Sequence, residues 1–220
     1  MDWTTERAAA FIDHTLLKPQ ATQAQIDQLC EEALSLGFAA VCVNPVHVPF
    51  CVKKLSGASP KVCTVVGFPL GASPTELKVA EARWALHEGA DEIDMVMSIG
   101  AAKDGSWDEV GADIAAVVEE GGGKTVKVIL ETCYLNSEEK TLACQAAERA
   151  GARFVKTSTG FGAGGATVED VVLMREAVSK NVEIKASGGI RDWQTMQAMI
   201  RAGAGRIGVS AGVAILNELR

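Results

Sequence analysis

Short apolar stretches alternate with longer amphipathic stretches along the whole chain, in eight successive pairs. The short stretches have the length of strands, whereas the long ones place apolar residues at helical spacing. Strands that alternate with helices pair in parallel through right-handed crossovers. Eight such units close naturally, so the pattern predicts a single α/β domain, a (β/α)8 TIM barrel, over residues 1–220.

The ends of the stretches predict where each element lies. The expected strands are Ile12–Thr15, Phe38–Asn44, Lys61–Phe68, Asp91–Met97, Thr125–Glu131, Arg153–Thr157, Val182–Ser187 and Arg206–Ser210. The expected helices are Thr22–Leu36, Pro45–Leu55, Pro74–Glu88, Trp107–Glu120, Ser137–Ala150, Val168–Ser179, Asp192–Ala202 and Val213–Leu219. Thr22 with Gln25, and Ser73 with Glu76, have the spacing of capping boxes, and Gly37 is typical of a helix end.

An open, doubly wound sheet is the alternative fold for the same alternation. Dinucleotide-binding sheets of that kind carry a G-x-G-x-x-G turn after the first strand. No such turn follows Ile12–Thr15, so the sequence favours the closed barrel.

The composition limits the function and the setting. The net charge is −7 and 48% of the residues are hydrophobic, which supports a large core and argues against nucleic-acid binding. The six cysteines form no C-x-x-C pair, so we expect buried thiols in a reducing compartment. The N-terminal residues lack a signal-peptide pattern, and no apolar run has the length of a membrane span. We therefore expect a cytoplasmic protein without membrane contact.

Charged residues interrupt three apolar strands near their C-terminal ends. Asp94 lies in one strand, Lys156 in another, and Lys185 in the strand that follows. Because side chains alternate along a strand, we expect these three to point into the barrel, where charges are paired or functional. Barrel enzymes place their chemistry at that end of the strands.

Three other charged residues share the same strand faces but lie lower in the expected barrel. They are Glu92, Lys127 and Glu183. We interpret them as a structural ion network, because buried charges need partners whether or not they act in catalysis.

Two lysines on adjacent strands can activate one of them as a nucleophile. Paired backbones lie about 5 Å apart, where two positive charges repel by about 3 kcal/mol at an effective dielectric of roughly 20. That repulsion equals about two pK units for whichever lysine is deprotonated, and desolvation acts in the same direction. We assign Lys156 as the amine nucleophile, Lys185 as the neighbouring cation, and Asp94, with a water, as the general acid and base. A lysine pair that binds an anion without a covalent step is the alternative.

Glycine-rich turns follow the last three expected strands. They are Gly160–Gly165, Gly188–Gly189 and Gly208–Ser210. Backbone N–H groups of such turns bind phosphate, and barrels often hold phosphate after strands seven and eight. Together the three turns predict a phosphate site beside the lysines.

Eight sequence motifs occur in a specific order along nearly the whole chain. They are IDHTLLKP (Ile12–Pro19), VCVNP (Val41–Pro45), VVGFPLG (Val65–Gly71), EIDMVMSIG (Glu92–Gly100), KVILET (Lys127–Thr132), FVKTSTGFGAGGAT (Phe154–Thr167), IKASGGIR (Ile184–Arg191) and RIGVSAG (Arg206–Gly212). In this order they resemble the deoxyribose-phosphate aldolase family. The resemblance implies a class I aldolase on a (β/α)8 barrel, with neither metal nor cofactor. The implied reaction converts 2-deoxy-D-ribose 5-phosphate reversibly to D-glyceraldehyde 3-phosphate and acetaldehyde, in deoxyribonucleotide catabolism.

The resemblance also implies roles for individual residues. The family's Schiff-base lysine matches Lys156, and its second lysine matches Lys185. Its proton-relay aspartate matches Asp94, and Asp13 matches a further acid near the relay. The positions that match its phosphate site are Gly160, Gly188, Gly189, Gly208 and Ser210. Ala211 stands where many relatives have a second small hydroxyl residue, so one phosphate hydrogen bond is expected to be missing. Family members are commonly dimers and sometimes tetramers, so we expect a homodimer or a homotetramer.

Two other functions fit the same barrel. One is a phosphosugar isomerase or synthase that works by acid–base chemistry alone, and the other is a non-catalytic phosphosugar-binding barrel. Neither would form a covalent bond between a substrate carbonyl and Lys156, which separates both from an aldolase.

Overall fold

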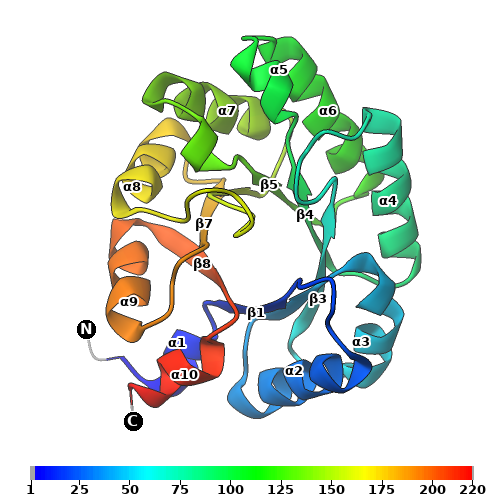
Figure 1. Ribbon diagram of the computed structural model, residues 1–220, viewed down its shortest axis with the longest axis vertical. Helices are drawn as coiled ribbons and strands as arrows, with labels where there is room; N and C mark the ends of the chain where they lie inside the picture. Colours follow the sequence, from blue (N-terminus) through cyan, green and yellow to red (C-terminus); the bar gives the residue numbers. More distant parts are fainter. Residues whose placement is uncertain (1–2, 220) are drawn as a thin grey trace.

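Eight parallel strands close into one barrel in the computed structural model, which describes residues 3–219 (Figure 1). Each strand pairs with its neighbours in chain order, and the first pairs with the last to close the barrel. The strands are Ile12–Leu16 (β1), Ala40–Val43 (β2), Lys61–Val66 (β3), Glu92–Val96 (β4), Thr125–Ile129 (β5), Phe154–Lys156 (β6), Glu183–Ser187 (β7) and Ala204–Val209 (β8). The barrel predicted from the sequence is confirmed. Met1, Asp2 and Arg220, which the expected domain includes, lie outside the described residues.

A helix follows every strand, and the helices form a ring around the barrel in Figure 1. In chain order they are Gln23–Leu36 (α2), Val48–Lys54 (α3), Thr75–His87 (α4), Trp107–Glu120 (α6), Ser137–Arg149 (α7), Val168–Ala177 (α8), Trp193–Ala202 (α9) and Gly212–Asn217 (α10). Further short elements were not expected: the helices Thr5–Ala9 (α1) and Ile99–Lys103 (α5), and the 3-10 turn Thr132–Tyr134. The 3-10 turn Pro45–His47 forms the first part of the helix expected over Pro45–Leu55.

The helix ends show which capping predictions hold. Thr22 and Gln25 form the expected capping box at the start of α2, and Gly37 ends that helix in the left-handed conformation. The capping box expected from Ser73 is wrong. Pro74 occupies the N-cap position of α4 without a side-chain hydrogen bond, and the hydroxyl of Thr75 donates to a carboxylate on α6 instead. A tertiary contact thus replaces the local cap.

The core has two layers because side chains alternate along each strand. The larger apolar layer fills the space between the barrel and the helices, and residues such as Ile93, Ile114 and Val128 belong to it. A much smaller apolar group lies on the other face of β2 and β3 and includes Cys42, Cys63 and Val65. The rest of the barrel interior is open to charged side chains.

The cysteines are buried as expected, with one exception. Five of the six cysteines are buried, Cys133 is exposed, and all six are free thiols. Among residues 3–219, no helix has both the length and the apolar character needed to cross a membrane.

Candidate active site

Asp94 lies at the centre of a group of buried cations. Its side chain in β4 is fully buried. Oδ1 of Asp94 accepts hydrogen bonds from Nζ of Lys127 at 2.8 Å and from Sγ of Cys63 at 3.1 Å. Oδ2 accepts from Nζ of Lys156 at 2.6 Å and from Nζ of Lys185 at 2.7 Å. The structure thus brings together the three residues that strand parity selected.

Asp13 joins this group from β1. Its Oδ2 lies 2.5 Å from Nζ of Lys185, and its Oδ1 accepts a hydrogen bond from Nη1 of Arg206 at 2.6 Å. Nζ of Lys127 lies 2.6 Å from Oε2 of Glu92. Four cations and three carboxylates therefore form one buried charged group: Lys127, Lys156, Lys185 and Arg206 with Asp13, Glu92 and Asp94. When every member is ionised, the group carries one positive charge in excess.

Burial and neighbouring charges act against each other on the two aspartates. Burial raises the pKa of Asp94, but the three lysines around it outweigh burial and hold the pKa well below its usual value. Burial also raises the pKa of Asp13, yet Lys185, Lys127 and Arg206 lower it to about 2. Both side chains are therefore carboxylates at neutral pH.

Lys185 remains a cation for a related reason. Burial lowers the pKa of Lys185, but the carboxylates of Asp13 and Asp94 raise it above the usual value. Gly208 in β8 provides the space that this side chain occupies. A Cβ atom on Gly208 would lie 3.1 Å from Cε of Lys185 and 3.0 Å from Cβ of Ser187. The glycine predicted for the phosphate site thus also lets the second lysine reach Asp94.

The structural ion network predicted lower in the barrel is correct only in part. Glu92 and Lys127 do pair, but Glu183 pairs with Arg153 at 3.0 Å, and its side chain is 39% exposed. Glu183 is the first residue of β7, so its side chain reaches solvent at the end of the barrel. Arg206 belongs to the network in place of Glu183, through its contacts with Asp13 and Glu92. The sequence analysis did not select Arg206, although its side chain shares strand parity with Gly208.

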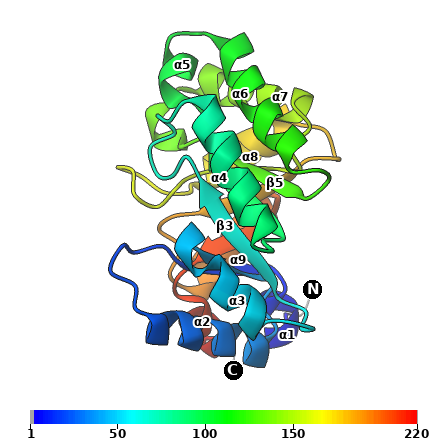
Figure 2. The same cartoon turned by 90° about the vertical axis from the view of Figure 1, so that its right-hand side faces the viewer.

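A cavity of about 440 Å³ opens at the C-terminal ends of β1, β6, β7 and β8. Lys156 lines it, while the other members of the charged group are not among its lining residues. All the positions predicted for phosphate binding also line it: Gly160, Gly188, Gly189, Gly208 and Ser210. Figure 2 shows the loop after β1 (blue) and the loop after β6 (yellow) projecting from the same side of the barrel. The size is that of a pocket for a small molecule.

The sequence reasoning missed several residues of this cavity. Lys18 and Arg191 line it, are exposed, and form no ion pair with another residue of the described chain. Both follow strand ends within the quoted motifs, which is a signal that could have found them. Phe161 also lines the cavity, and its ring packs edge-on against Phe68 at 5.4 Å between centroids.

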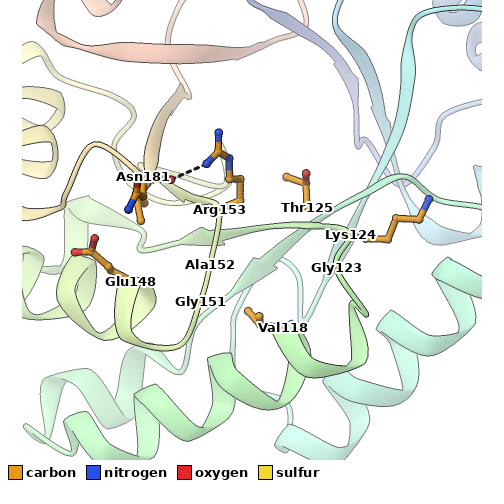
Figure 3. Close-up of a pocket in the computed structure, with 10 residues that line it drawn as sticks. Val118, Gly123, Lys124, Thr125, Glu148, Gly151, Ala152, Arg153 and Asn181 are labelled. Atoms are coloured by element: carbon orange, nitrogen blue, oxygen red, sulfur yellow. Dashed lines mark hydrogen bonds between the residues drawn. The ribbon is translucent and has the colours of Figure 1, made fainter.

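A larger cavity, of about 600 Å³, lies at the opposite end of the barrel (Figure 3). Its lining includes Lys124, Arg153 and Asn181, which precede β5, β6 and β7. Arg153 donates a hydrogen bond to the carbonyl of Asn181 at 2.8 Å, the dashed line in Figure 3. Because none of the buried charged group reaches this cavity, size does not identify the active site here.

Within residues 3–219, one set of side chains has the spacing of a metal site. Ligand atoms of Cys42, Cys63 and Asp94 lie within 4.8 Å of one another. Both oxygens of Asp94 already accept hydrogen bonds from lysine amines, and those positive charges oppose a further cation. The donor set therefore does not suit a metal ion, and the metal-free reaction remains a prediction.

The fold and this site are those of a barrel enzyme, with the cavity beside Lys156 at the C-terminal ends of the strands. Comparisons with known proteins give the family. A family model described as "DeoC/LacD family aldolase" matches residues 7–218. A deoxyribose-phosphate aldolase of Streptococcus gordonii is 58% identical over 206 residues, which covers 94% of each chain. One of Thermococcus gammatolerans is 58% identical over 217 residues and 96% of each chain.

Solved structures agree with the sequence comparison. The tetrameric structure of deoxyribose phosphate aldolase from Aeropyrum pernix superposes with a TM-score of 0.91 at 33% identity, over 98% of this chain and 92% of that one. The chain belongs to the DeoC/LacD family of aldolases, and it is a lyase.

Proposed function

We propose that this aldolase cleaves 2-deoxy-D-ribose 5-phosphate reversibly to D-glyceraldehyde 3-phosphate and acetaldehyde, through a Schiff base on Lys156. The names of the relatives support the substrate. The observation that carries the proposal is the position of one amine. Lys156 is the member of the buried charged group that lines the cavity, so a substrate carbonyl can reach its amine.

Lys156 has fewer carboxylate partners than the other two buried lysines. Its amine pairs with the single carboxylate of Asp94, whereas Lys185 and Lys127 each pair with more than one. Deprotonation of one lysine removes the excess positive charge of the group, and it costs least where the fewest carboxylates are lost as partners. The sequence argument counted only repulsion between Lys156 and Lys185. Asp94 lies between their amines, so the lysines are better compared through the charge of the whole group.

The proposed reaction follows standard carbonyl chemistry. The neutral Lys156 amine adds to the C1 aldehyde of the open-chain sugar, and the carbinolamine that forms takes up a proton and loses water to give an iminium ion. A base removes the proton of the C3 hydroxyl, the C2–C3 bond breaks, and its electron pair moves into the iminium to form an enamine. D-glyceraldehyde 3-phosphate leaves. The enamine then takes up a proton at C2, and hydrolysis releases acetaldehyde and the amine.

Asp94 and Lys185 are proposed to move the protons, with a water as relay. When Lys156 forms the neutral enamine, Asp94 keeps only two of its three cations and accepts a proton more readily. Lys185 stays positively charged beside it and can return a proton to the substrate. Asp13 holds Lys185 in place through the 2.5 Å contact.

The phosphate is proposed to bind at the mouth of the cavity. Gly188, Gly189 and Gly160 provide backbone N–H groups along its wall, and Ser210 adds a hydroxyl. Lys18 and Arg191 supply positive charge without competing carboxylates. Because these groups lie on loops that follow four different strands, they would hold the sugar chain across the barrel mouth, with C1 toward Lys156.

Trapping with acetaldehyde and borohydride tests the proposal. Reduction of the Schiff base should leave an ethyl group on Lys156, identified by peptide mass spectrometry, and Lys156→Ala should lose both the adduct and turnover while remaining folded. An isomerase, a synthase or a binding barrel would give no such adduct. A protein that turns over the sugar phosphate without an adduct at Lys156 would contradict the mechanism.

We also propose a homo-oligomer, a dimer or a tetramer, in the cytoplasm, with a role in deoxyribonucleotide catabolism. Leu77 and Trp84 are seven residues apart on α4, lie on one face, and are 58% and 43% exposed. Such an apolar face suits contact with a second copy, and the Aeropyrum pernix relative is tetrameric. The free cysteines fit a reducing compartment.

A further inference from the structure

Glu131 has an unusual backbone and a buried side chain directly beside the lysine strand. It follows β5, is 1% exposed, and has φ 56° and ψ 63°. Among residues 3–219 it is the non-glycine residue with a positive φ. An L-residue in this left-handed region costs about 1 kcal/mol, and such outliers often mark functional positions.

The backbone on either side of Glu131 is fixed to β6. The N–H of Leu130 donates to the carbonyl of Lys156 at 2.9 Å, and the N–H of Thr132 donates to the carbonyl of Thr157 at 3.0 Å. Glu131 therefore lies between two backbone hydrogen bonds that join its segment to the segment carrying Lys156. Its left-handed conformation turns the side chain toward the loop that follows.

The Glu131 carboxylate receives its hydrogen bonds from Thr159. The N–H of Thr159 lies 3.2 Å from Oε1 and 3.3 Å from Oε2, and the Thr159 hydroxyl donates a short hydrogen bond to Oε2. That hydroxyl in turn accepts a hydrogen bond from the N–H of Phe161 at 3.0 Å. Gly162 packs against the same carboxylate, since a Cβ atom there would lie 3.0 Å from Cδ of Glu131. One carboxylate thus fixes the turn from Thr159 to Gly162.

The fixed turn forms one wall of the cavity. Thr159, Gly160 and Phe161 line it, and a Cβ atom on Gly188 would lie 3.7 Å from Cα of Gly160, so the turn meets the opposite wall. We propose that Glu131 is a positioning residue: it holds the Thr159–Gly162 turn against the phosphate end of the substrate and keeps that turn in register with Lys156. This inference rests on the proposed function above.

A glutamine at this position weakens the interaction with Thr159. The N–H and the hydroxyl of Thr159 both lie within hydrogen-bond distance of Oε2 of Glu131, so the amide oxygen of a glutamine can still accept from both. The negative charge is lost in Glu131→Gln, and hydrogen bonds to a charged acceptor are about twice as strong as those to a neutral one. The loss of that charge corresponds to about a tenfold change in an equilibrium or rate.

The experiment compares two substrates in Glu131→Gln. The kcat/KM for 2-deoxy-D-ribose 5-phosphate should fall about tenfold, mainly through KM. The kcat/KM for unphosphorylated 2-deoxy-D-ribose should stay unchanged, because that sugar has no phosphate to contact the turn. Glu138→Gln, an exposed change on α7, is the control and should leave both values unchanged. A Glu131→Gln variant that keeps the wild-type ratio between the two substrates would overturn the inference.

Variants of Thr159 keep the test valid if Glu131→Gln does not fold. Thr159→Val removes the hydroxyl, so it should lower the ratio of kcat/KM for the phosphorylated sugar to kcat/KM for the unphosphorylated sugar, as Glu131→Gln does. Thr159→Ser keeps a hydroxyl and should leave that ratio within about twofold of the wild-type value. The double variant Glu131→Gln/Thr159→Val should lose little more than either single variant, since the two residues share one interaction. If the effects of the two single variants simply add in the double variant, Glu131 and Thr159 do not act through one shared interaction.

The acetaldehyde adduct separates this inference from the proposed function. Acetaldehyde does not extend to the turn, so Glu131→Gln should form the reduced adduct on Lys156 to the wild-type extent. An absent adduct in the unmodified protein would overturn the proposed function and the inference with it. A normal adduct with an unchanged substrate ratio would overturn the inference alone.

Discussion

Lys156 and Lys185 are register partners on β6 and β7, and their amines contact the same oxygen of Asp94, at 2.6 and 2.7 Å. A carboxylate placed between two amines reduces their repulsion and makes the charge of each depend on the other. Lys185 also contacts Asp13, so its charge is the better stabilised of the two.

Removal of the Lys185 charge should therefore retain the proton on Lys156. In Lys185→Met, three cations face three carboxylates, and deprotonation of Lys156 no longer removes an excess charge. The pH profile of acetaldehyde adduct formation should move upward by about one to two pH units. Lys180→Met, at an exposed position, should keep the wild-type profile. An unchanged profile in Lys185→Met would contradict the role of the charged group.

Gly208→Ala tests the space that Lys185 requires. The added Cβ would lie 3.1 Å from Cε of Lys185 and 3.0 Å from Cβ of Ser187, so Lys185 would have to move away from Asp94. We expect overpacking to cost about 1–3 kcal/mol of stability and kcat to fall more than tenfold. Steady-state kinetics and urea unfolding measure the two effects.

The matched control for that change is Gly111→Ala. Gly111 lies within α6, and a Cβ atom there meets no other atom within 4 Å. Alanine should leave kcat unchanged and stabilise the helix by about 0.5–1 kcal/mol. Equal kinetic effects at both glycines would show that Gly208 has no special role.

Asp13 should make the protein sensitive to acid. Its folded pKa of about 2 lies below the ordinary value of 3.8, so it stabilises the fold above about pH 4 and loses that effect as pH falls toward 2. The contribution is about 2 kcal/mol, of which roughly half is gone by pH 3. In Asp13→Asn the free energy of unfolding should fall less steeply between pH 6 and pH 3.

The slope is the quantity to compare, because Asp13→Asn also leaves Lys185 and Arg206 short of a partner and lowers stability at every pH. Urea unfolding at several pH values gives that slope. Asp104→Asn, at an exposed position, should keep the wild-type slope. A wild-type slope in Asp13→Asn would show that the carboxylate does not gain its stability from the cations around it.

The barrel was predictable because its signals are local. Apolar periodicity and the caps at Thr22 and Gly37 set the elements, and parallel pairing of neighbours follows from their alternation. The short helices Thr5–Ala9 and Ile99–Lys103 escaped prediction because one helical turn is too short for a periodic pattern. The Ser73 cap failed because a contact with α6, remote in sequence, decides the local geometry there.

Strand parity predicted the part of the candidate site that lies within the strands. Parity alone placed Lys156, Lys185 and Asp94 together, whereas Asp13 came only from the family resemblance. Glu131 was missed because its left-handed conformation turns the side chain out of the strand alternation. The sequence contains no pattern that predicts the hydrogen bonds from Thr159 to the Glu131 carboxylate.

Two ion pairs bridge the same helices, α4 and α6, in opposite surroundings. Nζ of Lys78 lies 2.6 Å from Oδ2 of Asp113, and both side chains are buried. Nη2 of Arg83 lies 2.7 Å from Oε2 of Glu120, with the arginine side chain 66% exposed. The buried pair also supports the barrel mouth, since a Cβ atom on Gly67, just after β3, would lie 3.0 Å from Cε of Lys78.

Lys78→Met should therefore be far more damaging than Arg83→Met. Loss of Lys78 leaves the Asp113 carboxylate buried with only the Thr75 hydroxyl as partner, which should lower the free energy of unfolding by about 3–5 kcal/mol. Arg83→Met should change it little, because solvent screens that pair. The double variant Lys78→Met/Asp113→Leu should recover most of the loss, since no charge then stays buried without a partner. Urea unfolding at pH 7 measures all three, and similar effects for Lys78 and Arg83 would mean that burial does not set the strength of these pairs.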